Sequence, residues 1–260
     1  MSQPITVKLL QDKKSRGEKF SVLTAYDASI ARLCEKAGVD VILVGDSLGM
    51  VIQGHDTTVP VTMDDIIYHA KCVARATTHV VKMLDMPFMS FAYPSQAIDN
   101  AARLMQEGYA EVIKLESGAH QSELISDLSL NGVPVCAHLG LTPQTIHKLG
   151  SYGKRGKDSA EAKKILSDAE KLEKAGADLI LLECVPAALA KQVTRSVSVP
   201  VIGIGAGRDV DAQVLVIYDI LGASGYIPSF AKNFLTQADS IEGAIRLYVE
   251  SVKNGSFPEA

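Results

Sequence analysis

Short apolar runs rich in β-branched residues recur along the chain, and segments with helical periodicity separate them. The runs are Phe20–Ala25, Val41–Gly45, Val80–Leu84, Glu111–Leu115, Val133–Ala137, Asp178–Leu182, Val199–Ile204 and Val214–Asp219. Strands that are apolar on both faces are typical of a parallel sheet that is covered on both sides. This rhythm predicts an α/β protein, a single (β/α)8 TIM barrel over residues 1–260. A doubly wound open sheet is the alternative.

The segments between these runs carry recognisable helix signals. Ser159–Ala175 places its alanine, leucine and isoleucine side chains on one stripe, as an amphipathic helix does. Thr62 and Asp65 have the spacing of a capping box, which predicts that a helix begins directly after Thr62. Ser95 is expected to cap a helix that runs to Gly108.

A few local features stand out from this rhythm. The phrase EKAGVDVILV at Glu35–Val44 returns as EKAGADLILL at Glu173–Leu182, which indicates one helix–glycine–strand joint used twice. Only Arg208–Gln213 separates the last two strands, which is too short for a full helix. Leu139–Asp158 is long and polar, so we expect an active-site loop there. Gly203–Gly207 lacks the spacing of a phosphate-binding loop and predicts a tight turn or a close approach to a ligand.

Polar residues gather where the predicted strands end. Barrel enzymes carry their chemistry at the carboxyl ends of the strands, so polar side chains there are candidates for a site. The candidates are Asp46, Ser47, Asp85, Lys114, Glu116, His138 and Glu183. Because side chains alternate along a strand, Lys114 and Glu116 are expected on the same face.

Three of these candidates are acids on neighbouring strands, namely Asp46, Asp85 and Glu116. Two carboxylates about 5 Å apart repel each other by roughly 3 kcal/mol at an effective dielectric of about 20. Either some of them are protonated, or a cation holds them together. Oxygen ligands without a nearby Cys or His pair favour Mg²⁺ over Zn²⁺. The alternative is that each acid only caps the helix that follows it.

The residues around the ends of the fifth and sixth strands have different interpretations. His138 is either a hydrogen-bonded core histidine or a member of the site. Glu183 ends the apolar run LILLE, where a carboxylate is a candidate general base. Cys184 is expected to point to the opposite face, toward the helices. Both Cys184 and Cys136 are expected to contribute packing.

Composition limits the partners and the cellular location that are expected for this protein. The chain has 260 residues, of which 47% are hydrophobic, and a formal net charge of −4. Because it has no long basic run, nucleic acid and anionic membranes are not expected as partners. No apolar stretch reaches the roughly 20 residues of a membrane span, and the N-terminus does not resemble a signal peptide. Four separated cysteines without a C-x-x-C pair are typical of a reducing cytosol, so we expect a cytoplasmic protein.

The longest motifs resemble those of one enzyme family. They are LVGDSLGMVIQGHDTTVPVTMDDIIYH at Leu43–His69, DMPFMS at Asp85–Ser90, IKLE at Ile113–Glu116, HLGLTPQ at His138–Gln144, LLECVP at Leu181–Pro186 and IGIGAG at Ile202–Gly207. Together they resemble the ketopantoate hydroxymethyltransferase family, from Phe20 to about Phe234. The resemblance implies a barrel of the phosphoenolpyruvate mutase/isocitrate lyase-like type and a homo-oligomer, commonly a decamer.

The resemblance also implies a reaction and the residues that perform it. A hydroxymethyl group passes from 5,10-methylenetetrahydrofolate to 3-methyl-2-oxobutanoate, giving 2-dehydropantoate and tetrahydrofolate in pantothenate (coenzyme A) biosynthesis. The residues implied to bind Mg²⁺ are Asp46, Asp85 and Glu116, the last either directly or through water. Those implied to contact the oxo acid are Asp46, Ser47, Asp85, Lys114 and His138. Glu183 is implied to remove the proton at C3 of the oxo acid.

Four positions depart from the family's pattern. Glycines are expected where Ser117, Ala137 and Ala212 stand. A small residue is expected where Leu84 stands, just before Asp85. These departures bear on folate affinity and on loop behaviour more than on the reaction.

Two other classes of protein compete with this interpretation. A carbon–carbon or carbon–phosphorus lyase of the phosphoenolpyruvate mutase and isocitrate lyase type also presents Mg²⁺ and a 2-oxo acid at the strand ends. Such lyases typically carry a K-K-C-G-H loop, which this chain lacks. A barrel that only binds ligand is the second alternative, and the acids Asp46, Asp85 and Glu183 together with Lys114 argue against it.

Overall fold

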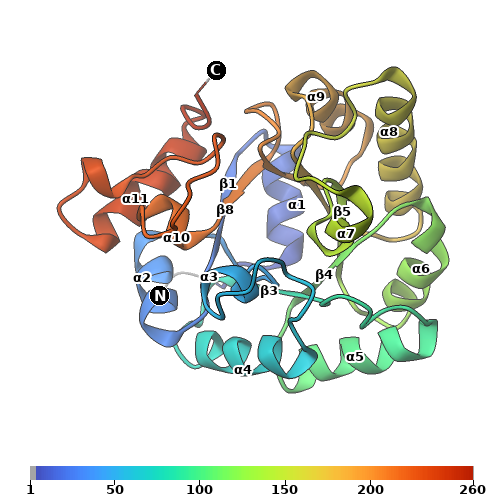
Figure 1. Cartoon of the computed structure of the whole chain (residues 1–260), viewed down its shortest axis with the longest axis horizontal. Helices are drawn as coiled ribbons and strands as arrows, with labels where there is room; N and C mark the ends of the chain where they lie inside the picture. The colour runs from blue at the N-terminus through green and yellow to red at the C-terminus, as the bar shows by residue number, and fades with distance from the viewer. Residues whose placement is uncertain (1–3, 260) are drawn as a thin grey trace.

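The computed structural model describes residues 4–259 of the chain. Its strands are β1 (Phe20–Thr24), β2 (Val41–Val44), β3 (Val81–Asp85), β4 (Val112–Glu116), β5 (Val135–Gly140), β6 (Leu179–Glu183), β7 (Val201–Ile204) and β8 (Ala212–Leu215). Each strand pairs in parallel with the next, and β8 pairs with β1, so the barrel is closed (Figure 1). The closed barrel confirms the predicted (β/α)8 architecture and excludes the open sheet.

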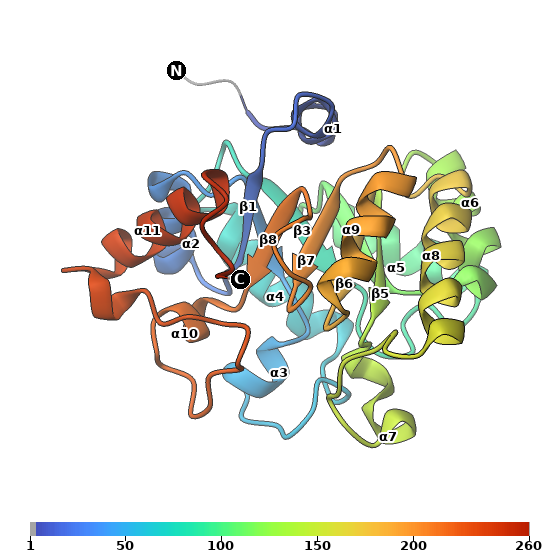
Figure 2. The same ribbon diagram turned by 90° about the horizontal axis from the view of Figure 1, so that it is seen from above.

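Helices cover the outside of the barrel (Figure 1). The longer ones are α2 (Ala28–Ala37), α4 (Met63–Ala74), α5 (Pro94–Gln106), α6 (Ser122–Leu130), α8 (Ser159–Lys174), α9 (Ala187–Ser196) and α11 (Ile241–Lys253). Short helices and 3-10 turns lie in the connections, namely α3 (Leu48–Val51), η1 (Ala119–Gln121), η2 (Pro143–Thr145), α7 (Ile146–Leu149), α10 (Ile217–Ile220) and η3 (Leu235–Gln237). Figure 2 shows α3 and α7 at one end of the barrel and α1 (Val7–Ser15) at the other.

The connection between β7 and β8 contains no helix in the part of the chain that the structure describes. This agrees with the short Arg208–Gln213 separation, because so few residues cannot form a helix that crosses the outer layer. Over residues 4–259, no helix is both long enough and apolar enough to span a membrane.

Alternate positions along the strands build two separate cores. The inner core fills the barrel and contains Phe20, Val22, Val41, Leu43, Val81, Met83, Val112, Cys136, Leu179, Leu181, Ile202, Ala212 and Val214. Neighbouring strand residues such as Leu23 and Ile42 pack outward against the helices. Because the inner side chains fill the lower barrel, it is a packed core rather than a pore. The expectation that Cys136 contributes packing is confirmed.

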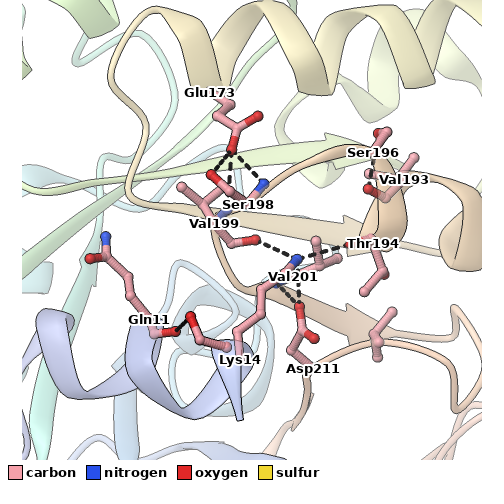
Figure 3. Close-up of polar contacts among 12 residues, drawn as sticks. Gln11, Lys14, Glu173, Val193, Thr194, Ser196, Ser198, Val199, Val201 and Asp211 are labelled. Atoms are coloured by element: carbon pink, nitrogen blue, oxygen red, sulfur yellow. Dashed lines mark hydrogen bonds and ion pairs between the residues drawn. The ribbon is translucent and has the colours of Figure 1, made fainter. Parts of the chain in front are cut away.

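Helix α1 closes the amino-terminal end of the barrel. Leu10 is fully buried and belongs to the inner core. The amine of Lys14 donates to the carbonyls of Thr194 at 2.9 Å and Val199 at 2.8 Å, and it pairs with Asp211 at 3.0 Å (Figure 3). Because Val199 lies two residues before β7 and Asp211 one residue before β8, this lysine links α1 to the amino ends of the strands.

The last strand differs from its predicted position. β8 spans Ala212–Leu215 rather than Val214–Asp219, because the chain leaves the sheet and turns into α10 at Ile217. The N–H of Ile217 donates to Thr24 Oγ1 at 2.9 Å, which fixes this turn against the end of β1. A helix of apolar residues directly after a strand has the same apolar appearance as a longer strand.

Two of the three helix signals are confirmed. The capping box is present, since the N–H of Asp65 donates to Thr62 Oγ1 at 3.2 Å and the N–H of Thr62 donates to Asp65 Oδ2 at 2.9 Å. Helix α8 begins and ends within one residue of its predicted bounds. The prediction that Ser95 caps a helix is wrong, because α5 already begins at Pro94. Proline suits the first helical turn, where its missing N–H has no helical partner.

One buried carboxylate, Asp40, joins both ends of the chain to the barrel. It accepts from the amine of Lys13 in α1 at 2.7 Å and pairs with Lys253 in α11 at 3.0 Å. It also accepts from the N–H and Oγ of Ser21, both at 3.0 Å. Burial alone would raise the pKa of Asp40, but Lys253, Lys13 and Ser21 outweigh it and hold the pKa below its usual value of 3.8.

Replacing Asp40 by asparagine is expected to lower the free energy of unfolding by about 3 kcal/mol at pH 7, because two lysines then lose their partner. A carboxylate with a lowered folded-state pKa stabilises the fold above its unfolded pKa, and this contribution disappears as the pH falls through the folded-state value. The difference between wild type and variant should therefore persist down to about pH 4 and shrink below it. Urea unfolding at several pH values measures this.

Asp12→Asn is the matched control for this test. Asp12 lies in the same helix α1 and pairs with Lys8, but its side chain is 42% exposed. Its replacement should change stability by about 0.5 kcal/mol or less at every pH. An equal loss in the two variants would show that Asp40 is no more important than a surface acid.

Candidate active site

A cavity of about 660 Å³ opens at the carboxyl ends of the strands, opposite α1. All seven residues that the sequence indicated line it, namely Asp46, Ser47, Asp85, Lys114, Glu116, His138 and Glu183. The structure therefore brings together every predicted site residue. This follows from the fold, because the carboxyl ends of all strands in a closed parallel barrel meet at one rim.

The centre of the site is an ion pair between adjacent strands. Asp85 on β3 and Lys114 on β4 are register partners, and the Lys114 amine is in hydrogen-bond contact with Asp85 Oδ1. The other oxygen of Asp85 accepts from the N–H of Asp46 at 3.0 Å. Burial lowers the pKa of Lys114, but the carboxylates of Asp85 and Asp46 outweigh this and raise it above its usual value. Lys114 is therefore a buried, permanently charged ammonium group.

The negative charge of Asp46 is only partly balanced by its neighbours. Burial, followed by the nearby charge of Asp85, raises the pKa of Asp46 to about 7, although Lys114 and a hydrogen bond from Gln144 oppose the shift. Gly45 lets the strand approach Asp85 closely, since a Cβ on it would lie 3.2 Å from Asp85 Oδ2 and 3.1 Å from Ser47 Oγ. The end of β2 is thus packed tightly around the charged centre.

Glu116 has an unpaired buried oxygen. Its Oε1 accepts from the backbone N–H of Gln144 at 2.9 Å. Its Oε2 has no hydrogen-bond partner within residues 4–259, although the residue is only 7% exposed. Burial, and next the charge of Asp46, raise the pKa of Glu116 well above its usual value. An unpartnered buried carboxylate oxygen is unfavourable by itself and suits a cation or a bound polar ligand.

The acids do not form a ready-made metal site by themselves. Among the described residues, no group of three or more His, Cys, Asp and Glu side chains could hold a metal ion as they stand. Lys114 contacts one oxygen of Asp85, and an amide donates to one oxygen of Asp46. Three buried carboxylates nevertheless face one buried ammonium, and this surplus of negative charge fits a divalent cation at this end of the cavity.

Gln144 is a site residue that the sequence reasoning missed. Its Nε2 donates to Asp46 Oδ2 and to the carbonyl of Met86, both at 2.9 Å. Together with its backbone contact to Glu116, this buried side chain joins the ends of β2, β3 and β4. It belongs to the HLGLTPQ motif, but it lies after the end of β5 in a polar segment. Spacing gave no sign that the segment folds back over three other strands.

His138 and Glu183 face each other across β5 and β6. His138 Nε2 lies 3.2 Å from Glu183 Oε2, but neither ring nitrogen has a partner in hydrogen-bond geometry within residues 4–259. Burial, and then Lys114, lower the pKa of His138, so the imidazole is neutral at pH 7. The absence of a partner in hydrogen-bond geometry among the described residues disfavours the interpretation as a hydrogen-bonded core histidine, and membership of the site stays a prediction. The Glu183 side chain is 17% exposed and reaches the cavity.

Tyr26 is a second residue that the sequence reasoning missed. Its hydroxyl lies 2.8 Å from Ser47 Oγ in hydrogen-bond contact, and its ring stacks on Tyr218 with centroids 6.2 Å apart. The tyrosine is 1% exposed, so its position is fixed by packing. The contact sets the orientation of the Ser47 hydroxyl. Tyr26 follows directly after an apolar run, where it looks like one more core residue.

Cys184 lies at the wall of the cavity, and the prediction that it points toward the helices is wrong. Its backbone has φ 48°, in the left-handed region, and β6 has already ended at Glu183. Strand alternation therefore no longer applies at this residue. Burial raises the pKa of the thiol to about 12, so Cys184 is not a thiolate nucleophile.

The segment after β5 forms one side of the cavity, as expected for an active-site loop. Tyr152 and Lys154 line the mouth, and the N–H of Arg155 donates to the carbonyl of Cys184 at 2.8 Å. Gly140, with φ 94°, begins the segment, and a Cβ there would lie 2.3 Å from the carbonyl oxygen of Glu183. Only glycine fits this close crossing of β5 and β6.

The four positions that depart from the family pattern lie away from the cavity lining. Leu84 and Ala137 pack outward in the helical layer. Ala212 belongs to the inner core near the amino ends of the strands. Ser117 borders a separate pocket next to Glu116. None of the four is among the residues that line the main cavity.

Comparison with known sequences indicates one family. The family model for ketopantoate hydroxymethyltransferase matches residues 4–260. A 3-methyl-2-oxobutanoate hydroxymethyltransferase from Alkalilimnicola ehrlichii is 55% identical over 259 residues, which are 99% of this chain and 94% of the relative. A protein with the same name from Shewanella loihica is 53% identical over 257 residues, which are 98% of this chain and 97% of the relative.

Comparison with solved structures indicates the fold type. Phosphonopyruvate hydrolase in complex with oxalate and Mg²⁺ has a TM-score of 0.64 at 15% identity, covering 84% of each chain. A 2,3-dimethylmalate lyase of the phosphoenolpyruvate mutase/isocitrate lyase superfamily has a TM-score of 0.59 at 13% identity, covering 85% of this chain and 84% of the lyase. The chain therefore shares the barrel fold of these two proteins.

Proposed function

Because the chain belongs to the ketopantoate hydroxymethyltransferase family, we propose that its cavity transfers a hydroxymethyl group from 5,10-methylenetetrahydrofolate to 3-methyl-2-oxobutanoate. The products are 2-dehydropantoate and tetrahydrofolate, and the reaction belongs to pantothenate (coenzyme A) biosynthesis. The observation that supports this most directly is that one cavity contains both an acidic centre suited to a cation and the carboxylate of Glu183. A 2-oxo acid needs both, since a proton must leave C3 while negative charge develops on the ketone.

Mg²⁺ fits the acidic centre, with Asp46, Asp85 and Glu116 as the residues that would hold it. Their oxygens are hard ligands, and the unpartnered Oε2 of Glu116 is available to a cation. When bound, the ion supplies positive charge that balances the surplus carboxylates and stabilises the enolate form of the oxo acid.

The chain's own residues bind and orient the oxo acid. The charged amine of Lys114 is placed to attract the substrate's carboxylate and to stabilise negative charge that develops on its 2-oxo group. The Ser47 hydroxyl, oriented by Tyr26, donates a further hydrogen bond. His138 is uncharged, lines the cavity beside Glu183 and helps to position the oxo acid.

Glu183 is the general base in this proposal. Its Oε2 accepts the proton from C3, and the electrons of that bond form the new bond from C3 to the methylene carbon of the folate, while the bond from this carbon to one of its two folate nitrogens breaks. Water then replaces the second folate nitrogen on this carbon, and its oxygen becomes the new hydroxyl group. The proton from C3 and the two protons of water end on the product hydroxyl and on N5 and N10 of tetrahydrofolate.

Two assays with the purified protein test the proposal. The complete reaction should form 2-dehydropantoate only when the oxo acid, Mg²⁺ and 5,10-methylenetetrahydrofolate are all present. The first half of it needs no folate, because the C3 proton should exchange with D₂O in the presence of Mg²⁺ and be visible by NMR. A protein that binds the oxo acid without exchanging this proton would be a binding barrel rather than the proposed enzyme.

Replacing Gln144 by leucine is expected to weaken Mg²⁺ binding by about 10- to 100-fold, as the loss of a side chain that orients metal ligands does. Leucine keeps the volume but frees Asp46 Oδ2 and the carbonyl of Met86. Isothermal titration of the protein with Mg²⁺ in the presence of oxo acid measures the change. Gln121→Leu is the control, since Gln121 borders the neighbouring pocket and its Oε1 has no partner among the described residues.

Three further expectations belong to this proposal. They are a single catalytic domain over residues 1–260, a cytoplasmic location and assembly into a homo-oligomer, commonly a decamer. The first is supported by one barrel that closes within the chain. The other two come from composition and from the family resemblance, and sedimentation of the purified protein tests the assembly.

A further inference from the structure

The cavity is much larger than the oxo acid requires. Its volume of about 660 Å³ is in the range of roughly 300–1,000 Å³ that accommodates drug-sized ligands. A five-carbon oxo acid held at the acidic centre leaves most of this space for a second, larger substrate. The chemistry of the remaining space therefore indicates what that substrate presents to the protein.

Part of the cavity lining comes from α10 and the loop that follows it. This part includes Tyr218, Asp219, Ser224, Tyr226 and Phe230, which we call the aromatic lobe. Figure 2 shows this loop at the same end of the barrel as α3, opposite α1. A flat, largely apolar ring system suits such walls.

Asp219 is the carboxylate among the residues of the aromatic lobe. Asp219 is 6% exposed, and Ser224 Oγ donates to its Oδ1 at 2.6 Å. Within residues 4–259, its Oδ2 has no hydrogen-bond partner, and no Lys, Arg or His side chain pairs with it. The carboxylate can therefore accept hydrogen bonds from a ligand in the cavity, and it lacks a structural partner that would explain its charge.

The aromatic lobe is continuous with the catalytic end of the cavity. Gly205 has φ 60°, and a Cβ on it would lie 3.0 Å from the ring of Phe230 and 3.2 Å from Cys184 Sγ. Phe230 therefore packs beside Cys184, which directly follows Glu183. A ligand that lies along Phe230 reaches toward Glu183 without leaving the cavity. Gly205 and Gly207 both have positive φ, which agrees with the tight turn that the sequence predicts, and Gly205 also allows close packing at the cavity wall.

We propose that the aromatic lobe binds the pterin ring of the folate co-substrate, with Asp219 accepting from the ring N3–H and the 2-amino group. The proposal rests on the function proposed above. A pterin presents two adjacent N–H donors on one edge, and a carboxylate with two oxygens matches that pattern. Tyr226 and Phe230 contact the apolar faces of the ring. Asp219 is thereby the residue that selects the co-substrate, while the acidic centre selects the oxo acid.

Asp219→Asn is the principal test. It keeps the size of the side chain but replaces one acceptor by a donor, so the KM for 5,10-methylenetetrahydrofolate should rise by about 10- to 100-fold. The C3 proton exchange of the oxo acid, which needs no folate, should keep its wild-type rate. Tyr226→Ala should raise the same KM by about 2- to 10-fold, since it removes only ring contact from a side chain that is 77% exposed. Asp239→Asn, an exposed acid outside the cavity lining, is the control and should change neither quantity.

A folate analogue separates pterin recognition from a general effect. Wild type should bind tetrahydrofolate about 10- to 100-fold more tightly than its 2-desamino analogue, and Asp219→Asn should lose this preference. An unchanged folate KM and preference in Asp219→Asn, with exchange intact, would overturn the inference and leave the proposed function standing. Loss of proton exchange in this variant would also overturn it, because Asp219 would then act on the oxo acid or on the fold. Absence of exchange in wild type would instead contradict the proposed function itself.

Discussion

Glu183→Gln should slow the exchange of the C3 proton of 3-methyl-2-oxobutanoate in D₂O by about 10²- to 10⁴-fold, the usual contribution of a general base. Glutamine has the shape of glutamate and can form similar hydrogen bonds, but it cannot accept the proton. The side chain reaches the cavity and faces the neutral ring of His138, so no cation of the described residues pairs with it in the structure. NMR of the oxo acid with protein and Mg²⁺ measures the rate directly.

The binding of the oxo acid in the presence of Mg²⁺ should change little in this variant, because Glu183 is proposed as a base and not as a ligand. His138→Gln is the informative partner variant, since it changes the other member of the facing pair. If Glu183→Gln exchanges the proton at the wild-type rate, the base is another group, with His138 the next candidate. Slow exchange together with lost binding would favour a structural role for Glu183.

Asp85→Asn should weaken Mg²⁺-dependent binding of the oxo acid by more than the roughly 10- to 100-fold that loss of an orienting side chain costs. Asp85 is the acid that contacts both the Lys114 amine and the N–H of Asp46, so its charge acts on the whole centre. Asparagine preserves the shape and removes the charge. Isothermal titration with the oxo acid, with and without Mg²⁺, is the measurement.

This variant also leaves the buried ammonium of Lys114 without its nearest partner, which costs about 3–5 kcal/mol of stability for a buried pair. The double variant Asp85→Asn/Lys114→Met removes both charges and should recover stability without recovering Mg²⁺-dependent binding. Thermal unfolding of the three proteins separates the two effects. Wild-type affinity in a folded Asp85→Asn protein would exclude Asp85 as a metal ligand.

Much of the site could be predicted from the sequence because each of its predicted residues is local to a strand end. The apolar run LILL followed by Glu183 gives both a strand and its end, and seven polar residues at or near strand ends line one cavity in the structure. No long-range information was needed for this step, since closure of a parallel barrel brings all carboxyl ends to one rim. Helix starts such as that of α4 were equally predictable, because a capping box satisfies backbone groups within one turn.

The remaining features depended on contacts between residues far apart in the chain. Gln144 lies 98 residues from Asp46, whose carboxylate it holds, and Tyr26 reaches its serine partner from another strand end. The direction of Cys184 follows from a left-handed backbone conformation that strand alternation does not describe. In the same way, the apolar pattern places Asp219 in a strand, and only the turn into α10 brings it to the cavity.

The sequence by itself determined the barrel, the rim of polar residues and the family, since these depend on periodicity, on local capping and on long motifs. The tertiary structure alone decided which partners hold the acids in place, that His138 is neutral and lies beside Glu183, and that the aromatic lobe lines the same cavity as the acidic centre. The physical reason is that burial and pairing set the charge and orientation of a side chain, and both arise only when distant segments pack together.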